Sequence, residues 1–564
     1  MFIGKIGIVS RTYRHVNRYR QIVTVLFRYG FGDLVDRLNV GQYLEIGMQM
    51  VSKKRRERVE TLTREERIRM ILEELGPTFV KLGQILSTRP DLIPVSLIRE
   101  LSKLQDEVPP FPASQAKAIV ETELNAPVGE LFQKFDEIPM AAASIGQVHR
   151  AQLKSGEEVI VKVQRPQIKP QIEVDLEILL HLATLVEKHM EEGELYRPTR
   201  IVEEFARIIE KEIDYTIEAS YAERFARQFL GNTDIYVPRV FREYSTKRVL
   251  TMEYVSGIKA SEIVALDDQG YDRKIIASRG ADLLLQQIFT HGFFHGDPHP
   301  GNIYILPDNV ICYFDFGMMG SVDRQSREQL ADMVYALVKR DESGVVDSLL
   351  RIVEWDEEPD RRRLEIDMAD FMELYLYKSL KEIRVEHILQ QLLELIPRHR
   401  LIIPFDRFLM MKALATMEGL GLVLNPDFDM TARAAPFIRR VKLERLHPAR
   451  MIDELMITGN EVIELLRVIP GELRDILKQI KQGKVRIGFE HRGLERFIFE
   501  MDRASNRIAF ALVISSIVVG SSLIINTNIG PTLFGLPVFG LIGFSMAGIL
   551  GVWLIIAIIR SGRI

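Results

Sequence analysis

Two long runs without a charged residue near the C-terminal end constrain the fold of this chain most. Residues 508–525 form a run of 18 residues, and residues 537–559 form a run of 23. As a helix, 18 residues span about 27 Å, close to the hydrocarbon thickness of a bilayer. Neither run has a polar face, which disfavours a buried helix pair in a soluble core. With the turn-forming residues 526–536 between them, the two runs predict a transmembrane helical hairpin.

The charges around this hairpin predict its orientation. Arg503 and Arg507 precede the first run, Arg560 and Arg563 follow the second, and the connecting loop has no Lys or Arg. By the positive-inside rule, both outer ends and the whole chain before them are expected on the cytoplasmic side of a bacterial inner or plasma membrane, or on the matrix or stromal side in an organelle. Small residues at four-residue spacing favour close packing of the helices on each other or on a second copy, as a homodimer: Ser516, Gly520, Gly543, Ala547 and Gly551.

The N-terminal end is strongly basic. Residues 1–32 hold six Lys or Arg and no Asp or Glu, and residues 53–56 form a second basic run. Such stretches are typical of nucleic-acid arms, targeting peptides or membrane-surface helices. The apolar pieces are short and interrupted by arginine, so we expect no signal peptide. The basic, amphipathic pattern over residues 11–38 favours a helix on an anionic membrane surface or against the protein body over a cleavable transit peptide.

The composition of the whole chain is that of a globular protein. Of its 564 residues, 47% are hydrophobic and 27% are charged, which is enough apolar material for two to four domains. The formal charge of −4 gives no overall bias toward nucleic acid, and we expect no nucleic-acid partner. The single cysteine, Cys312, excludes an intramolecular disulfide and is expected to be a small residue of a buried strand.

The middle of the chain alternates between strand and helix patterns. Thr63 and Glu66 form a predicted capping box for a helix that breaks at Gly76 and Pro77 and resumes to about Leu86. Further patterns predict strands over 147–153, 158–163 and 248–254, helices over 172–191 and 201–229, and mostly helix from there to residue 440. A small mixed lobe followed by a larger helical lobe is the α+β layout of a two-lobed kinase.

Residues suited to phosphoryl transfer occur in the order that such a fold requires. Lys162 stands in an apolar strand, where a lone lysine is costly without a partner. The segment 295–302 (HGDPHPGN) places Asp297 and Asn302 five residues apart, and Asp315 opens an Asp-Phe-Gly triplet 13 residues later, after an apolar strand. Each motif alone is weak evidence. Their combination at this spacing is strong evidence for an ATP site with a magnesium ion.

Two other functions compete with this interpretation. His291, His295 and His299 are spaced at four and, with Asp297, could be taken for the metal cluster of an oxygenase. The intervening glycines and proline prevent a continuous helix that would align the imidazoles, and no G-x-G-x-x-G segment follows a strand to hold a flavin or nicotinamide cofactor. A pseudokinase scaffold that binds nucleotide and lipid without turnover is the more serious alternative.

With these motifs the chain resembles the UbiB/AarF family of atypical kinases. The resemblance covers roughly residues 20–440 and extends to the C-terminal hairpin typical of bacterial members. Its most specific marks are residues 81–84 (KLGQ), residues 141–147 (AAASIGQ) in place of a glycine-rich loop, and residues 212–215 (EIDY) with Glu218. All of them stand intact here. The resemblance implies a protein-kinase-like fold with a helical N-terminal extension and a C-terminal two-helix transmembrane hairpin.

The resemblance also implies roles for single residues. Lys162 would hold the α- and β-phosphates of ATP and pair with Glu218, although Asp214 lies four residues before Glu218 and spacing alone does not decide between them. Asp297 would be the catalytic aspartate, and Asn302 and Asp315 would bind Mg²⁺. The nucleotide would further contact Ala141, Ala142, Ala143, Ser144 and the hinge residues Glu253 and Val255.

Two features set the site apart from that of an ordinary kinase. Alanines restrict the backbone conformations that a glycine loop uses to close on phosphates, so the nucleotide is expected to bind in another pose or with changed selectivity. In the family, the extension is thought to fold over the place where a protein substrate would dock. Lys81, Gln84, Glu212 and Asp214 would then form a polar lid near the phosphates.

The predicted organisation therefore has six parts. These are a basic arm (1–60), a helical extension (61–135), a kinase-like N-lobe (136–256) and C-lobe (257–440), a helical linker (441–505) and the hairpin (506–564). The expected function is that of a membrane-anchored, Mg²⁺- and ATP-dependent atypical kinase or ATPase that supports isoprenoid-quinone biosynthesis of the ubiquinone type. Its partners could include membrane lipids, isoprenoid-quinone precursors and quinone-biosynthesis enzymes.

Overall fold

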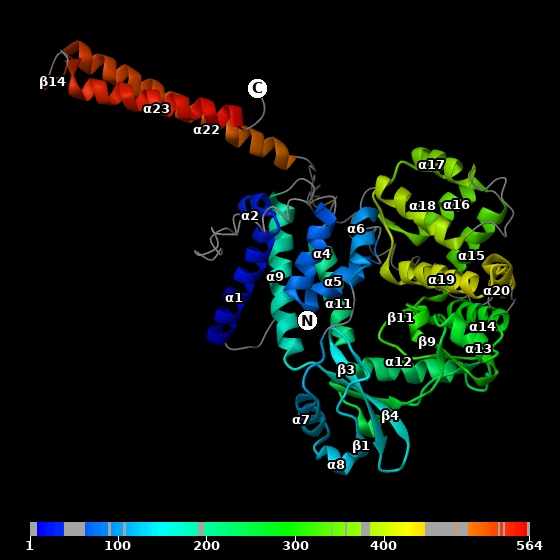
Figure 1. The fold of residues 1–564 in the computed structure, drawn as a ribbon. Coiled ribbons are helices and arrows are strands. Elements are labelled where there is room, and N and C mark those ends of the chain that lie inside the picture. The colour runs from blue at the N-terminus through cyan, green and yellow to red at the C-terminus, as the bar shows by residue number, and fades with distance from the viewer. Residues whose placement is uncertain are drawn as a thin grey trace. The chain divides into compact units, whose positions relative to one another are not determined.

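The structure, a computed structural model, divides into two compact units, Met1–Met451 and Ile452–Ile564 (Figure 1). The predicted basic run 53–56 and most of the predicted linker 441–505 lie outside the described residues. The structure describes residues 8–38, 62–87, 89, 92–104, 109–189, 197–339, 341–355, 358–373, 384–445, 481, 494–527, 531–533 and 536–560.

A five-stranded antiparallel sheet forms the small lobe of the first unit. Its strands run in the order β1-β3-β4-β6. The short strand β2 pairs with the start of β3, and β1 pairs with the end of β3. The predicted strands are confirmed, and Gly156, with φ of 102°, forms the turn between β3 and β4. Val159, Val161 and Val163 are fully buried in a core shared with helix α7 (Ala113–Leu124). The strands are β1 (Phe132–Phe135), β2 (Ala141–Ala142), β3 (Gly146–Leu153), β4 (Glu158–Gln164) and β6 (Val249–Glu253), and α8 (Val128–Leu131) precedes β1.

The sequence predicts a single helix over 201–229, but the structure has two helices there. The prediction is wrong at residues 213 and 214, where the helix is interrupted. After α9 (Ile168–His189), α11 (Pro198–Glu212) ends and α12 (Tyr215–Gln228) begins three residues later. The break occurs because Asp214 has an extended backbone and its carboxylate accepts the Thr216 N–H, as an N-cap does. Asp214 therefore shares no helix face with Glu218.

The core of the large lobe contains two long helices that pack on each other. In it α14 (Arg273–Leu285) packs against α19 (Phe405–Leu424), so closely that a Cβ at Gly280 would lie 3.1 Å from Met417 Sδ. Cys312 is fully buried, as predicted. One small sheet has the order β5-β10-β9-β7 and a second pairs β11 with β8. Their bounds are β5 (Ile235–Tyr236), β7 (Ile258–Lys259), β8 (Phe293–His295), β9 (Ile303–Leu306), β10 (Val310–Tyr313) and β11 (Met319–Ser321).

The remaining helices of this lobe enclose a second hydrophobic core. Val346, Leu364 and Met368 are fully buried there, and Phe408 joins the core from α19. The elements are α13 (Ile263–Asp268), α15 (Arg324–Lys339), α16 (Glu342–Ile352), β12 (Glu354–Trp355), α17 (Arg361–Glu373), α18 (Val385–Arg398), β13 (Leu401–Ile402) and α20 (Met430–Arg445). The α+β, two-lobed layout is thus as predicted.

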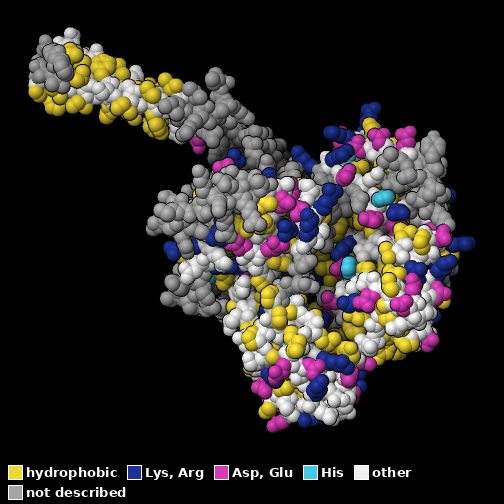
Figure 2. Space-filling model, in the orientation of Figure 1, with side chains coloured by type: hydrophobic (Ala, Val, Ile, Leu, Met, Phe, Trp, Pro, Cys, Tyr) yellow, Lys and Arg dark blue, Asp and Glu magenta, His cyan; other side chains and the backbone are white. Residues whose placement is uncertain are grey.

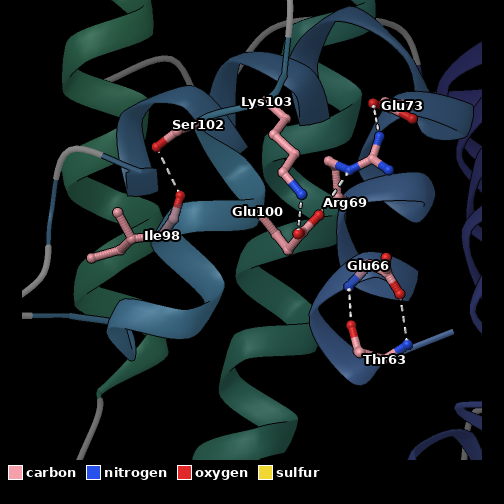
Figure 3. Close-up of polar contacts among 8 residues, drawn as sticks. All are labelled: Thr63, Glu66, Arg69, Glu73, Ile98, Glu100, Ser102 and Lys103. Atoms are coloured by element: carbon pink, nitrogen blue, oxygen red, sulfur yellow. Dashed lines mark hydrogen bonds and ion pairs between the residues drawn. The ribbon is translucent and has the colours of Figure 1, made fainter.

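The predicted helical extension is present, and its capping box is confirmed (Figure 3). Glu66 N donates to Thr63 Oγ1 at 3.2 Å, and Thr63 N donates to Glu66 Oε2 at 2.8 Å. Gly76, with φ of 93°, separates the first two helices, as expected from the sequence. Arg69 of the first helix pairs with Glu73 one turn later in the same helix and with Glu100 of the third helix (Figure 3). The helices are α4 (Arg64–Leu75), α5 (Pro77–Ser87) and α6 (Val95–Leu101).

The basic N-terminal segment forms helix α1 (Ile8–Arg28), followed by α2 (Gly32–Arg37), and α1 lies against the protein body (Figure 1). Arg18 Nε bonds the fully buried carboxylate of Asp175 on α9 at 2.6 Å, and Arg28 pairs with Glu74 on α4. The apolar face of α1 is buried in one hydrophobic cluster with residues of α4 and α9. Of the two predicted placements, against a membrane or against the body, the structure has the second, and acidic partners on α9 and α4 pair there with Arg18 and Arg28.

In the second unit two long apolar helices, α22 (Leu494–Thr527) and α23 (Val538–Arg560), pack on each other. Gly540 and Gly543 of α23 meet Ser521 of α22, whereas a Cβ at Gly520 or Gly551 would have no neighbour within 4 Å. Only part of the predicted small-residue pattern therefore lies at the contact. The segments Ala504–Thr527 and Val538–Ile555 are long and apolar enough to cross a membrane, and many hydrophobic side chains lie on the visible surface of this pair (Figure 2).

Candidate active site

Lys162, Glu218 and Asp315 come together from three elements of the first unit. Lys162 Nζ of β4 lies 2.5 Å from Glu218 Oε1 in the first turn of α12, and 3.8 Å from Asp315 Oδ1 after β10. Burial alone would lower the pKa of Lys162, but the two carboxylates outweigh it and raise that pKa above its ordinary value. The ammonium therefore stays charged, and the lysine pairs with Glu218 and not with Asp214.

The Asp-Phe-Gly triplet is held by contacts with its own backbone and with its surroundings. Gly317 N donates to Asp315 Oδ1 at 3.0 Å, and Phe316 is fully buried against Phe225 of α12. Desolvation would raise the pKa of the Asp315 carboxyl, but the Lys162 ammonium and the Gly317 amide lower it. The carboxylate is thus anionic and, with its side chain 54% exposed, open to a ligand.

His295 connects the predicted catalytic loop to this triplet. Its side chain is 1% exposed, its Nδ1 accepts the Asp297 N–H at 3.3 Å, and its Nε2 pairs with the Asp315 carbonyl oxygen. Only the neutral Nε2–H tautomer satisfies both contacts, and burial, which lowers the pKa of His295, favours that neutral form. Asn302 ends the short helix η5 (Pro300–Asn302), and its Nδ2 lies 3.5 Å from the Asp297 carbonyl oxygen. The structure therefore brings Asp297, Asn302 and Asp315 to one place.

The three histidines spaced at four do not form a common site. His291 ends the π-helical segment η4 (Gln286–His291) and packs edge-on against Phe229. His295 is buried as described, and His299 Nδ1 accepts the Gly301 N–H at 3.2 Å. Within the residues that the structure describes, no group of three or more His, Cys, Asp or Glu is placed to hold a metal ion. The oxygenase interpretation therefore gains no geometric support.

A lysine that was not predicted from the sequence contacts the predicted catalytic aspartate. Lys412 of α19 places its Nζ 3.1 Å from Asp297 Oδ1. The sequence carried a usable signal, because Lys412 stands among apolar residues of its helix, as Lys162 does in its strand. No spacing rule connects it with Asp297, which lies on another element more than a hundred residues earlier in the chain.

The alanine loop is a closed hairpin. β2 pairs with the start of β3, and Ala143 N donates to the Gly146 carbonyl oxygen at 2.8 Å. The guanidinium of Arg165, a residue that our sequence analysis did not single out, holds the loop from the side. Its Nε donates to Ala143 O at 3.0 Å and its Nη2 to Pro109 O at 2.8 Å. Ala141 and Ala142 lie in β2, and Ser144 at the tip is buried.

Two further residues of the AAASIGQ segment have structural roles that explain their type. A Cβ at Gly146 would lie 2.7 Å from Val163 O and 2.5 Å from Tyr215 Oη, so only glycine fits there. The Gln147 side chain bonds both backbone groups of Phe111, accepting at 3.0 Å and donating at 3.2 Å. Gln147 therefore holds the segment that leads into α7 against the sheet.

The predicted adenine-contacting residues lie between β6 and β7. The Glu253 carboxylate accepts one shared hydrogen bond from the Tyr236 hydroxyl, with Oη 2.8 Å from each carboxylate oxygen, and another of 3.1 Å from Arg239 N. Its side chain is therefore engaged on the β5 side, which leaves its backbone as the group available to a base. Val255 is half-buried after the end of β6. Contact of either residue with a nucleotide stays a prediction.

Of the four predicted lid residues, two meet at the site. Lys81 of α5 pairs with Glu212 at the end of α11. Lys162 and the Gly317 amide lower the pKa of the Asp315 carboxyl more strongly, and the Lys81 ammonium adds a smaller effect in the same direction. The Gln84 amide lies 3.5 Å from the carbonyl oxygen of Leu104, and Asp214 caps α12. The geometry thus gives Gln84 and Asp214 local structural roles, and their action as a lid stays a prediction.

These residues fit the group that a kinase-like site implies. Asn302 and Asp315 offer the oxygen ligands that Mg²⁺ prefers. Lys162 is a charged, oriented ammonium beside them, which suits phosphate oxygens. Asp297 lies in the same loop as Asn302, and its predicted role toward an acceptor hydroxyl or water stays a prediction.

Comparison with known proteins agrees with this geometry. The model described as "ABC1 atypical kinase-like domain" matches residues 103–349, "UbiB helical domain" matches 368–429 and "ABC1/UbiB kinase-like C-terminal domain" matches 492–560. The chain is 35% identical over 483 residues to a "Probable protein kinase UbiB" of Pseudomonas putida, covering 83% of this chain and 87% of that one. It is 32% identical over 550 residues to an "Uncharacterized protein in hydrogenase 1 5'region" of Clostridium pasteurianum, covering 97% of this chain and all of the other.

A solved structure, the erythromycin complex of Rv3197 from Mycobacterium tuberculosis, matches with a TM-score of 0.46 and 24% identity, over 62% of this chain and 90% of that one. The family models cover both lobes and the apolar C-terminal helices, and the relatives extend over most of the chain. The kinase-like α+β fold expected from the sequence is confirmed, and the chain belongs to the ABC1/UbiB family of atypical kinases.

Proposed function

We propose that this protein binds Mg-ATP and transfers or releases its γ-phosphoryl group as an atypical kinase or ATPase. The observation that carries the proposal is the assembled set of Lys162, Glu218 and Asp315, with Nζ–Oε1 and Nζ–Oδ1 distances of 2.5 and 3.8 Å. A lysine held this way is oriented before the nucleotide arrives, so little reorganisation is needed on binding.

In this proposal each residue has one task. Lys162 neutralises the α- and β-phosphates, with Glu218 fixing its position. Asn302 and Asp315 hold Mg²⁺, which when bound neutralises charge on the phosphate oxygens. Asp297 orients the acceptor oxygen and receives its proton.

We further propose that α22 and α23 anchor the protein in a membrane, with the ATP site on the cytoplasmic side. Large apolar side chains on both helices are more than half exposed, among them Leu512, Val519, Leu523 and Ile549. A lipid environment would cover such a surface. The resemblance to UbiB suggests that ATP turnover supports isoprenoid-quinone biosynthesis, by extracting or presenting lipid precursors to quinone-biosynthesis enzymes.

A nucleotide-binding scaffold without sustained turnover is the second candidate. It is favoured by the closed alanine loop, whose backbone N–H at Ala143 is already bonded to Gly146, and by the Lys81–Glu212 pair beside Asp315. In a glycine-rich loop such amides are available to phosphates.

ATP turnover by the purified full-length protein separates the two candidates. Phosphate release is measured with and without anionic vesicles and a phenolic quinone-precursor mimic, with Asp297→Asn as the matched control. Sustained release that is stimulated by the vesicles or the phenol and lost in the control supports the enzyme at a membrane. Mg-ATP binding with no release beyond that of the control supports the scaffold.

A further inference from the structure

The cation that contacts Asp297 comes from outside the kinase-like part of the chain. Lys412 lies in α19, within the segment that matches the UbiB helical domain, whereas the match to the kinase-like domain ends at residue 349. Its side chain is 21% exposed and that of Asp297 is 35% exposed, so the ion pair is open on one side. A solvated surface pair would leave both groups mostly exposed. A substrate group can therefore reach this pair.

Close packing of α19 on the catalytic loop places the lysine there. A Cβ at Gly296, the residue before Asp297, would lie 2.5 Å from Leu409 Cδ2. Leu409 and Lys412 are three residues apart and share a helix face. Because Gly296 lets Leu409 approach, the next position along that face reaches Asp297.

The catalytic loop itself supplies no comparable charge. Residues 295–302 include no Lys or Arg. The histidine two residues after Asp297 is engaged locally, since His299 Nδ1 accepts the Gly301 N–H. Phosphoryl transfer spreads negative charge over the oxygens of the transferred group, and a cation on the acceptor side stabilises it. Lys162 is bound to Glu218 and lies beside Asp315, on the metal side of the site.

We propose that Lys412 is a catalytic residue whose ammonium contacts the γ-phosphate oxygens while it holds the Asp297 carboxylate in place. This inference rests on the proposed phosphoryl-transfer function. In the step, the acceptor oxygen forms a bond to the γ-phosphorus while the bond from that phosphorus to the β–γ bridging oxygen breaks. ADP leaves with the electron pair of the broken bond, and the acceptor proton passes to Asp297. Lys412 keeps its protons throughout.

The structure also allows the opposite role for the same ion pair. If Lys412 blocked Asp297 from the acceptor, it would inhibit the enzyme, and its removal would accelerate turnover. If the role of Lys412 were purely structural, its removal would change the stability of the fold and leave the ratio of ATP to ADP affinity unchanged. The three roles therefore predict different results for one substitution.

The test measures binding of Mg-ATP and Mg-ADP separately from turnover, with the full-length protein and Lys412→Ala. Lys442→Ala is the matched control, because Lys442 is also a part-buried lysine of the large lobe paired with an aspartate, at 3.8 Å from Asp332. We expect Lys412→Ala to weaken ATP binding by roughly tenfold with ADP binding unchanged, and to slow single turnover by about 100-fold. The control should change neither quantity.

Chemical rescue distinguishes the ammonium group from the helix that carries it. In Lys412→Cys, alkylation with bromoethylamine restores an amine at nearly the original length. The native chain has one cysteine, Cys312, which is fully buried and so protected from the reagent. Recovery of both the ATP preference and the turnover after alkylation is the expected result.

Three outcomes would overturn the inference. Faster turnover in Lys412→Ala would show that the pair inhibits. An unchanged ratio of ATP to ADP affinity in Lys412→Ala, with wild type binding ATP more tightly, would show that the lysine does not contact the γ-phosphate. Failure of the wild-type protein to bind Mg-ATP would overturn the proposed function, and this inference with it.

Discussion

Replacing Gly296 with alanine should push α19 away from the catalytic loop. The new Cβ would lie 2.5, 2.7 and 2.9 Å from three carbons of Leu409, roughly 1 Å closer than carbon atoms pack. Overpacking of this kind costs about 1–3 kcal/mol. We therefore expect Gly296→Ala to lower the free energy of unfolding by that amount and, because Lys412 moves with the helix, to slow turnover as well.

A double-mutant cycle and a control on the same helix make this test specific. Leu409→Ala alone opens a cavity at a cost of about 2–5 kcal/mol, but it also makes room for the new methyl group. The double variant should therefore be more stable than the sum of the single effects implies, by at least ~1 kcal/mol. Gly419→Ala is the control, since a Cβ there has no neighbour within 4 Å, and it should raise stability by up to about 1 kcal/mol.

Thermal and urea unfolding of the full-length protein in one detergent would give these differences. The packing argument is refuted if Gly296→Ala is as harmless as Gly419→Ala. Strict additivity of Gly296→Ala and Leu409→Ala would refute it too.

Three further predictions concern other parts of the account. Asp315→Asn should abolish Mg²⁺-dependent nucleotide binding, because the metal loses its anionic ligand; unchanged thermal stabilisation by Mg-ATP in this variant would mean that the metal assignment is wrong. Removal of residues 506–564 should leave a folded, soluble protein that still binds Mg-ATP in a titration, since the two units are compact by themselves; loss of binding would contradict the proposed architecture. The third prediction concerns the alanine loop and the lid: Ala143→Gly should raise ATP affinity or alter its metal dependence by freeing the loop backbone. Lys81→Ala should change turnover without loss of fold, because its pairing with Glu212 is removed. Labelled-ATP assays in which neither variant differs from wild type would count against a restrained loop and a lid.

The core of the site could be predicted from the sequence because its residues stand in short, ordered motifs. Lys162, Asp297, Asn302 and Asp315 each follow or lie in a predicted strand or loop, and the fold brings such positions together. Strands β3, β4 and β6 were predictable for the same reason, since their alternation and turn residues are local signals. The short strands β7, β8, β9 and β11 were not, because they fall where mostly helix is predicted. The choice of Glu218 as the partner of Lys162 followed from the family resemblance, and spacing alone left it open.

What could not be predicted depends on tertiary contacts. The break after Glu212 arises because Asp214 caps the next helix, and an aspartate in a helical pattern is equally compatible with a continuous helix. The placement of α1 depends on the acidic partner Asp175, more than 150 residues away. Lys412 reaches Asp297 only because a helix of another subdomain packs on Gly296, and no pattern within α19 indicates that.

Single-turnover conversion of bound ATP tests the central claim most directly. The full-length protein is loaded with γ-labelled Mg-ATP, excess unlabelled nucleotide is added, and label released or transferred is followed in wild type and Asp297→Asn. Lys162 and Asp315 are intact in both proteins, so both should bind the nucleotide with similar affinity, and only the wild type should convert it. Equal conversion by the two proteins, or binding without conversion by either, would contradict a phosphoryl-transfer site built around Asp297.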